Sequence, residues 1–265
     1  MAALQALYYP GGKSRHRNKI LHHILPMLEG ANEYREPFVG SGVIGLAVMA
    51  RCPGLSYWLN DRDPAVTCLW WGLRHRGLEL IKLIETFEPR AEAFFTFKAE
   101  LDALANCPND PTEIVRVGFM KLALHRTSQS GFGSGVRGGK QEFATKIADR
   151  WKRDGVRTTA LAIANRLQRC KVKITGYDWR KLIDDAQGKI FFYLDPPYVM
   201  DNPEWQQHYY QHHFADADHS RLAEALKTLT HDWALSLGDH HRVRELYDWA
   251  RIRKIGAREL LITRE

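Results

Sequence analysis

An apolar run at residues 189–194 ends at the tetrapeptide Asp195-Pro196-Pro197-Tyr198. Six residues this rich in aromatic and aliphatic side chains predict a buried strand, and two prolines cannot continue its hydrogen-bond ladder. In an open parallel sheet, ligands bind beyond the carboxyl ends of the strands, so we expect this tetrapeptide to face a cleft. A strand followed by an inert Pro-Pro turn is the alternative.

The groups at this strand end suit a planar base that carries an exocyclic amino group. The Asp195 carboxylate and the Pro196 carbonyl can each accept a hydrogen bond from an NH2 group. The Tyr198 ring can stack on the base. The tetrapeptide therefore favours a nucleobase as the ligand.

Strand and helix patterns alternate in both end regions of the chain. Strands are expected near 34–38, 55–59, 172–175, 189–194 and 233–237, with a terminal strand pair around 252–262, and helices near 14–28, 43–50, from Asp63-Pro64 onward and 217–229. Between them, helices near 91–104, 113–124 and 147–167 flank a glycine-rich stretch. The pattern predicts an α/β fold in which residues 1–80 and 168–265 form a catalytic domain with a parallel sheet, and residues 81–167 an inserted helical domain.

Composition excludes several classes of protein. With 265 residues, 45% of them hydrophobic, the chain can bury a full core, which a small peptide-like module cannot. The four cysteines, Cys52, Cys68, Cys107 and Cys170, show no C-x-x-C pairing, which argues against a zinc ribbon or a disulfide scaffold. No stretch approaches the ~20 apolar residues that span a bilayer, and no signal peptide is evident. We expect a cytoplasmic protein without membrane contact.

Positive charge is concentrated in one part of the sequence. The net charge is +7, and residues 121–173 contain thirteen Lys or Arg but three acids. Such a local excess is typical of proteins that bind a polyanion. A solvated basic face is the alternative, and we favour nucleic acid.

A glycine-marked turn, residues 36–42 (E-P-F-V-G-S-G), leads from a predicted strand into a helix. Glycines there let the backbone approach a ligand closely, and the next strand ends at Asn60-Asp61. An acid about 20 residues after such a turn is where a ribose hydroxyl pair is held. The spacing favours a cofactor that contains adenosine, although Asp61 alone is also typical of a loop or capping acid.

The amino-terminal segment 8–14 (Y-Y-P-G-G-K-S) invites a P-loop interpretation. That motif requires glycine at position 7, where this chain has Leu7, so we exclude it. The glycine pair could instead close over a cofactor, with Lys13 facing a carboxylate or DNA.

Taken in order, six segments resemble the alpha-group (Dam-type) DNA adenine-N6 methyltransferases, which include phage and restriction-modification enzymes. Residues 9–13 are similar to the aromatic-x-G-G-K motif, 36–42 to the E-P-F-x-G-x-G loop, and 60–61 to the acid-bearing second motif. Residues 175–178 are similar to the segment that lines the cofactor's adenine, 195–198 to the D-P-P-Y motif, and 259–262 to the final E-L-L-I strand. The resemblance implies a Rossmann-like sheet with helices on both faces.

The resemblance also implies the activity and the residues that carry it. The enzyme would transfer a methyl group from S-adenosyl-L-methionine to N6 of an adenine flipped out of double-stranded DNA, without a metal ion and without an obligatory protein partner. The catalytic residues would be Asp195, Pro196, Pro197 and Tyr198. The cofactor would be bound by Tyr9, Gly11, Gly12, Lys13, Phe38, Gly40, Ser41, Gly42, Asp61, Tyr177, Asp178 and Asp195.

The insertion takes the place of the family's target-recognition domain. A segment ending in an N-R-x-x-x-N-G-like stretch there forms a hairpin that enters DNA, and residues 124–133 occupy its place. His125 and Ser130 stand where asparagines are usual, so no recognition sequence is carried over. Candidate contacts to phosphates or bases are Arg126, Ser128, Gln129, Arg137, Lys140, Lys146, Lys152 and Arg153.

Other functions remain open at this point. His212, His213, Asp216, Asp218 and His219, together with the triplet Asp239-His240-His241, are rich in metal-ligand types and would suit a metal-dependent nuclease or phosphoesterase. That mechanism has no use for the Pro-Pro turn or the glycine loop. An RNA adenine methyltransferase, a protein-glutamine methyltransferase and a catalytically dead DNA-binding relative are further alternatives.

Overall fold

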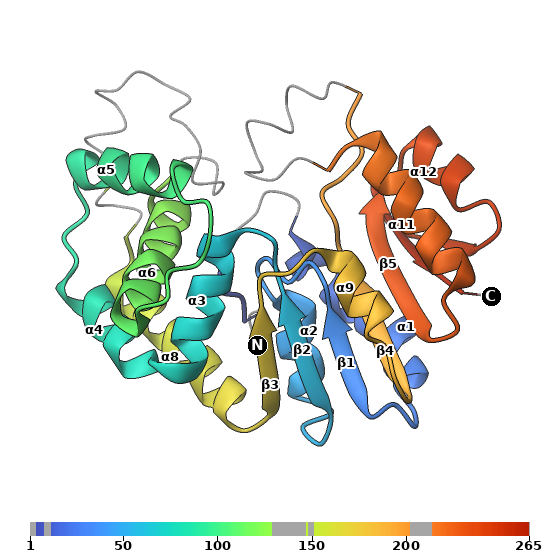
Figure 1. The fold of residues 1–265 in the computed structure, drawn as a ribbon, viewed down its shortest axis with the longest axis horizontal. Coiled ribbons are helices and arrows are strands. Elements are labelled where there is room, and N and C mark those ends of the chain that lie inside the picture. Colours follow the sequence, from blue (N-terminus) through green and yellow to red (C-terminus); the bar gives the residue numbers. More distant parts are fainter. Residues whose placement is uncertain (1–3, 8–11, 129–146, 148–150, 202–213, 265) are drawn as a thin grey trace.

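A single seven-stranded sheet organises the computed structural model, which describes residues 4–7, 12–128, 147, 151–201 and 214–264 (Figure 1). The strand order is β3-β2-β1-β4-β5-β7-β6. Neighbours among β1 to β5 pair in parallel, whereas β7 runs antiparallel to β5 and β6. The strands are β1 (Glu33–Glu36), β2 (Ser56–Asn60), β3 (Lys171–Thr175), β4 (Ile190–Leu194), β5 (Asp232–Gly238), β6 (Arg251–Gly256) and β7 (Glu259–Thr263).

The chain changes direction across the sheet between β1 and β4. β1 pairs with β2 on one side and with β4 on the other, where Tyr34 lies opposite Phe191. In open α/β sheets a ligand crevice forms outside the carboxyl ends of the strands at such a switch point. The segments that leave β1 and β4 are the glycine loop and the D-P-P-Y tetrapeptide, so the topology brings the two motifs to one place.

Helices cover both faces of the sheet, as predicted. Phe191 and Tyr193 of β4 belong to the core formed with α1 (Arg17–Met27) and α2 (Val43–Met49), which lie behind the sheet in Figure 1. Phe192 and Leu194 belong to the core on the other face, where α9 (Trp179–Asp184) and α11 (Asp216–Thr228) pack. Alternate residues of one strand thus enter two cores, which explains why the run is apolar throughout.

Two of the remaining helices begin at an acid whose side chain caps them. The Asp63 side chain accepts hydrogen bonds from the amides of Ala65 and Val66, and Pro64 opens α3, as predicted. Asp110 and Pro111 repeat this arrangement at α6. The remaining helices within the described residues are α3 (Pro64–His75), α4 (Gly77–Thr86), α5 (Ala91–Asp102), α6 (Pro111–Thr127) and α8 (Arg153–Gln168), followed near the carboxyl end by α12 (His241–Leu246).

The helical region between β2 and β3 packs on α3 rather than standing apart. Ala65 and Cys68 of α3 share a core with Phe94 and Met120. A Cβ on Gly118 of α6 would overlap the α3 backbone, so the two helices cross in close contact. The division at residues 81 and 167 remains a prediction.

Several predicted boundaries are wrong. The helix expected at 14–28 is a short 3-10 turn, η1 (Lys13–Arg15), followed by α1, and the single helix expected at 147–167 is interrupted at residues 151–152, after which α8 begins at Arg153. The strand expected at 34–38 ends at Glu36. In the part of the chain that the structure describes, no helix is long and apolar enough to cross a membrane.

Candidate active site

The glycine loop after β1 is held in place by the ends of β2 and β3. The Asn60 side chain donates hydrogen bonds to the carbonyls of Pro37 (3.0 Å) and Tyr177 (2.9 Å) and accepts one from the Tyr177 amide (2.8 Å). Asp61 accepts the Gly40 amide at 2.9 Å and the Asp63 amide at 3.0 Å. Three loops at the switch point are therefore fixed to one another by two adjacent side chains.

Gly42 at the end of this loop has a left-handed backbone, with φ +67°. A Cβ there would overlap the Trp70 ring, and the Trp70 indole donates to the Gly40 carbonyl at 3.0 Å. The second glycine of the motif is thus required by the turn and by the packing of α3 against it.

Lys13 is buried beside the D-P-P-Y tetrapeptide and is 5% exposed. Its ammonium lies 2.6 Å from Asp195 Oδ1 and 3.3 Å from Glu259 Oε1, and it donates to the Tyr198 hydroxyl. That hydroxyl donates in turn to Glu259 Oε1 at 2.6 Å. Four side chains from η1, the end of β4 and the start of β7 therefore form one polar network, in which Lys13 and Glu259 are buried and Asp195 and Tyr198 partly buried.

The network also fixes the Tyr198 ring. Lys13 Nζ lies 4.6 Å from the ring centroid, within the range of a cation–π contact. A Cβ on Gly238 would stand 3.0 Å from the ring, so the backbone at the end of β5 forms the surface against which the ring packs. Both the hydroxyl and the ring of Tyr198 are thereby positioned.

Burial and Lys13 have opposite effects on the acids of this network. Burial raises the pKa of Asp195, and the Lys13 ammonium opposes that rise. Burial likewise raises the pKa of Glu259, again against Lys13. Burial holds the pKa of Glu36 well above its usual range, against the hydrogen bond from Tyr34. Lys13 is therefore the group that favours the ionised form of both Asp195 and Glu259.

The family comparison agrees with this arrangement. The family described as D12 class N6 adenine-specific DNA methyltransferase matches residues 9–260, nearly the whole chain. The chain belongs to this family. It is an enzyme that methylates the N6 amino group of adenine in DNA, so the predicted activity is confirmed. Among curated proteins, none matches the chain.

The methyltransferase fold brings most of the predicted cofactor residues to the carboxyl edge of the sheet. Gly12 immediately precedes η1, which carries Lys13; Phe38, Gly40, Ser41 and Gly42 follow β1, and Asp61 follows β2. Tyr177, 43% exposed, and Asp178 follow β3. Asp178 caps α9 and pairs with Arg62 at 2.9 Å. Tyr9 and Gly11 lie outside the described residues.

Two of the predicted DNA contacts have partners inside the protein. The Arg126 guanidinium lies 3.3 Å from the carbonyls of both Gln5 and Ala6, and Arg153 pairs with Glu88 at 2.6 Å. Ser128 is buried at the end of α6. Lys152 is exposed and forms no ion pair within the described residues. Gln129, Arg137, Lys140 and Lys146 lie outside them.

Sequence reasoning missed two residues of the site. Asn60 and Glu259 belong to two of the family-like motifs, but no role was predicted for either. Asn60 joins the loops through hydrogen bonds, and Glu259 completes the polar network. Both stand at the carboxyl edge of the sheet, Asn60 at the end of β2 and Glu259 at the start of the antiparallel β7. A polar residue beside an apolar strand run was the signal that could have identified them.

The metal-dependent alternative is not favoured. Asp239 pairs with Arg244 at 2.7 Å and with Lys254 at 3.0 Å, whereas His240 Nε2 bonds Asp201 at 2.9 Å. His240 Nδ1 accepts the Arg242 amide, so both ring nitrogens are used. Asp201, His240 and His241 do lie together on the surface, but the triplet Asp239-His240-His241 does not converge on one point.

Proposed function

We propose that this methyltransferase takes its methyl group from S-adenosyl-L-methionine and acts on an adenine flipped out of double-stranded DNA at the crevice beside Asp195. One observation carries the proposal. The Lys13 ammonium donates a hydrogen bond to Oδ1 of Asp195, while Oδ2 accepts no hydrogen bond within the described part of the chain. An oriented carboxylate oxygen thus remains at the end of β4 for an amino group.

The residues of the carboxyl edge fit the cofactor. Each oxygen of Asp61 accepts one backbone amide, and a carboxylate has about four acceptor sites, so it can still accept two ribose hydroxyls. The exposed Tyr177 ring lies on the neighbouring loop and would pack against a base. When bound, S-adenosyl-L-methionine would supply an electrophilic methyl group.

Asp195 and Pro196 activate the target amine. The lone pair of N6 is delocalised into the adenine ring, so two acceptors on the NH2 hydrogens draw the group toward a tetrahedral shape. The Asp195 carboxylate is one acceptor and the Pro196 carbonyl is the other. Their placement by a rigid Pro-Pro turn lowers the barrier through orientation and electrostatics rather than through a covalent intermediate.

Lys13, Tyr198 and Glu259 act as a positioning set around this pair. Lys13 favours the ionised form of Asp195 and fixes its rotation through Oδ1. Glu259 accepts from the Tyr198 hydroxyl, which holds the ring in position to stack on the extruded base. The predicted recognition role of residues 81–167 belongs to the same proposal, with the exposed Lys152 as a phosphate contact.

The experiment begins by locating the methylated adenine, through sequencing of DNA treated with enzyme and cofactor. Duplexes in which that adenine faces thymine or a mismatched base are then titrated with the enzyme. A mismatch lowers the cost of extrusion, so binding should tighten several-fold. A duplex with the same mismatch one helical turn away is the control. Equal binding of target and control duplexes would contradict base flipping.

A further inference from the structure

Seven cations gather where α1 lies along the edge strand β6. They are Arg15, Arg17, Lys19, Arg251, Arg253, Arg258 and Arg264, which together define the α1–β6 face, and none of them forms an ion pair within the described residues. Three contacts establish that the helix and the strand are adjacent. Lys19 donates to the Ile255 carbonyl at 3.0 Å, a Cβ on Gly256 would overlap the His16 ring, and His23 lines a pocket with Arg253.

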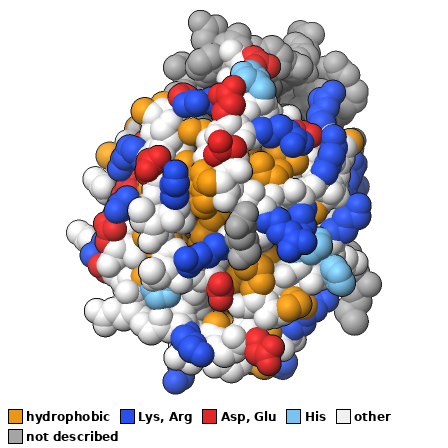
Figure 2. Space-filling view, turned by 90° about the vertical axis from the view of Figure 1, so that its right-hand side faces the viewer, with side chains coloured by type: hydrophobic (Ala, Val, Ile, Leu, Met, Phe, Trp, Pro, Cys, Tyr) orange, Lys and Arg blue, Asp and Glu red, His pale blue; other side chains and the backbone are white. Residues whose placement is uncertain are grey.

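Figure 2 looks onto this side of the molecule, and Lys and Arg side chains gather in the right-hand half of the view. The positive charges are close enough to disfavour one another. Burial lowers the pKa of His23, and Arg253 and Arg251 lower it further. Burial also lowers the pKa of His16, and the positive charges of Lys19, Lys13 and Arg15 lower it further. The face therefore has a positive potential, because its cations form no ion pair within the described residues.

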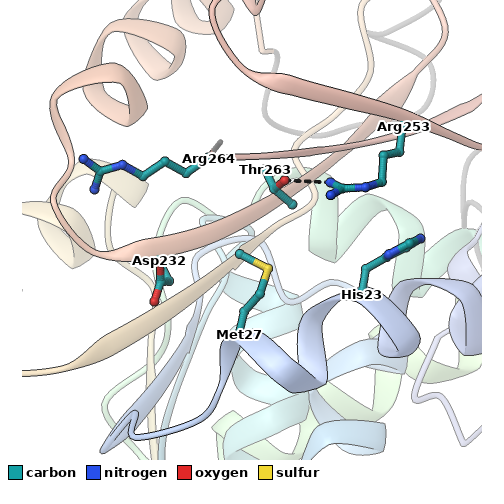
Figure 3. Close-up of a pocket in the computed structure, with 6 residues that line it drawn as sticks. All are labelled: His23, Met27, Asp232, Arg253, Thr263 and Arg264. Carbon is teal, nitrogen blue, oxygen red and sulfur yellow. Dashed lines mark hydrogen bonds between the residues drawn. The ribbon is translucent and has the colours of Figure 1, made fainter.

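A pocket lies beside Arg253 and Arg264 of this face, at the carboxyl end of β7 (Figure 3). It has a volume of ≈ 300 Å³ and is lined by His23, Met27, Asp232, Arg253, Thr263 and Arg264. Arg253 donates to the Thr263 hydroxyl at 2.9 Å, which fixes its guanidinium at the pocket wall. Asp232 contributes one carboxylate against two guanidinium groups, so the pocket favours an anion.

The α1–β6 face is continuous with the active site. Arg258 precedes Glu259 of the catalytic network, and β7 extends from Glu259 to Thr263 at the pocket. Four steps at ~3.4 Å per residue give roughly 14 Å between the two ends. Phosphates on one DNA strand follow one another every ~3.4 Å of helix axis, so a duplex that leaves the active site over this edge would present several of them.

Charged residues on an edge strand also serve to prevent pairing between sheets, which is the simplest alternative. That role requires cations on β6 only. Lys19 lies at that edge, where it donates to the Ile255 carbonyl, but Arg15 and Arg17 lie in η1 and α1, outside the strand, and extend the same field toward the active site. A single protective function therefore does not account for the whole face.

We propose that the α1–β6 face binds the phosphate backbone of duplex DNA that flanks the target adenine. The inference rests on the proposed function, because it takes duplex DNA as the partner. Its energetic contribution comes from released counterions and carries no base specificity. The face would increase affinity for long DNA without altering the choice of site.

The test compares two triple variants with equal loss of charge. The face variant is Arg15→Gln, Arg251→Gln, Arg264→Gln, and the control is Lys82→Gln, Lys171→Gln, Lys227→Gln; all six residues are exposed, and the structure gives none of them an ion pair within its described part. Binding is measured at several salt concentrations on duplexes of roughly 12 and roughly 40 base pairs centred on the target, about 40 and 140 Å long at 3.4 Å per step.

We expect the face variant to bind the long duplex on the order of tenfold more weakly, with a salt slope smaller by about one for each phosphate that the protein no longer neutralises. Its kcat at saturating duplex should match the wild type, because none of the three arginines belongs to the network of Lys13, Asp195, Tyr198 and Glu259. Equal losses in both variants, or unchanged affinity with increased self-association, would overturn the proposal. Tighter binding of single-stranded RNA than of long duplex through the same arginines would also overturn it. Methylation of the short duplex by the wild type tests the proposed function separately.

Discussion

The two ends of β7 carry charge in opposite ways. At Glu259 the side chains are buried, and Lys13 lies within 3.3 Å of two carboxylates. At Thr263 the neighbouring arginines form no ion pair within the described residues; Arg251 and Arg264 are exposed and Arg253 is half-buried. The first end contains a closed network of opposite charges, and the second contains like charges without counterions.

This difference sets how each region responds to substitution. Removing one member of a buried network leaves its partner charged and desolvated, so the effect is large and specific to the chemistry. Removing one cation from an exposed set takes away a single screened charge, so the effect is small, additive and dependent on salt. Substitutions in the two regions should therefore differ in size and in their dependence on salt.

Asp195→Ala should lower kcat by about 100- to 1000-fold, the usual effect of deleting one oriented hydrogen-bonding group at a reacting atom. Asp195→Asn should retain part of the activity, because its amide oxygen still accepts a hydrogen bond. Steady-state methylation assays measure both variants, and circular dichroism verifies that they fold. Full activity in the alanine variant would remove Asp195 from the catalytic step.

Lys13→Met should move the acidic limb of the kcat profile to higher pH. Lys13 lowers the pKa of Asp195 and of Glu259, so its loss raises both, and the ionised Asp195 then forms only at higher pH. Breaking the buried pairs should also lower the free energy of unfolding by about 3 kcal/mol.

Lys121→Met is the matched control for Lys13→Met. Lys121 forms a partly buried pair with Asp63 at 2.7 Å. Its loss should also destabilise the protein but leave the pH profile of kcat, measured at saturating cofactor, in place. If both variants shift the pH profile of kcat equally, the shift comes from general destabilisation, and Lys13 does not set the ionisation of Asp195.

Asp61 extends the comparison to a buried acid without a cation partner in its hydrogen bonds. Burial raises the pKa of Asp61 to about 7, and the neighbouring Asp63 adds to the rise. If the carboxylate form accepts the ribose hydroxyls, cofactor binding must release a proton below that pH. Affinity should then fall as pH drops through 7, by up to about tenfold per unit.

Calorimetric titration of S-adenosyl-L-methionine across this pH range tests the prediction. Asp61→Asn should bind with an affinity that no longer varies near pH 7. Asp61→Ala should weaken binding by about 1.5–3 kcal/mol, the range for hydrogen bonds to a charged group. Identical pH dependence in wild type and Asp61→Asn would place the titrating group elsewhere.

Substitutions at the two ends of β7 compare the regions directly. Glu259→Ala removes the acceptor of the Tyr198 hydroxyl and should lower kcat by about tenfold, the effect of a ~1.4 kcal/mol loss, with Glu259→Gln restoring most of it. Thr263→Ala, at the other end of the strand, should leave kcat unchanged. Similar kcat losses at both positions would show that β7 acts only through stability.

The sequence predicted the parts of the site that depend on short stretches of chain. The apolar run before Asp195 predicted β4, and Asp63-Pro64 predicted the start of α3. The helices α9 and α12, of six residues each, are too short to show a helical period, and they were missed. Local pattern therefore identified the motif that carries the chemistry.

Contacts between distant segments could not be predicted in this way. Lys13 and Asp195 are 182 positions apart, and no spacing rule relates them. The basic excess in residues 121–173 was visible in the sequence, yet the structure pairs Arg153 with Glu88 and Arg157 with Glu85. The α1–β6 face was invisible because two segments more than 200 residues apart contribute to it.

The identity of the methylated nucleoside shows whether Asp195 acts on the N6 amino group of adenine. Unmethylated DNA is incubated with methyl-labelled S-adenosyl-L-methionine and either the wild type or Asp195→Ala, digested to nucleosides and separated by mass. We expect the label in N6-methyladenine with the wild type, and no labelled N6-methyladenine with Asp195→Ala. Label in a methylated cytosine, or N6-methyladenine formed equally by the two proteins, would contradict it.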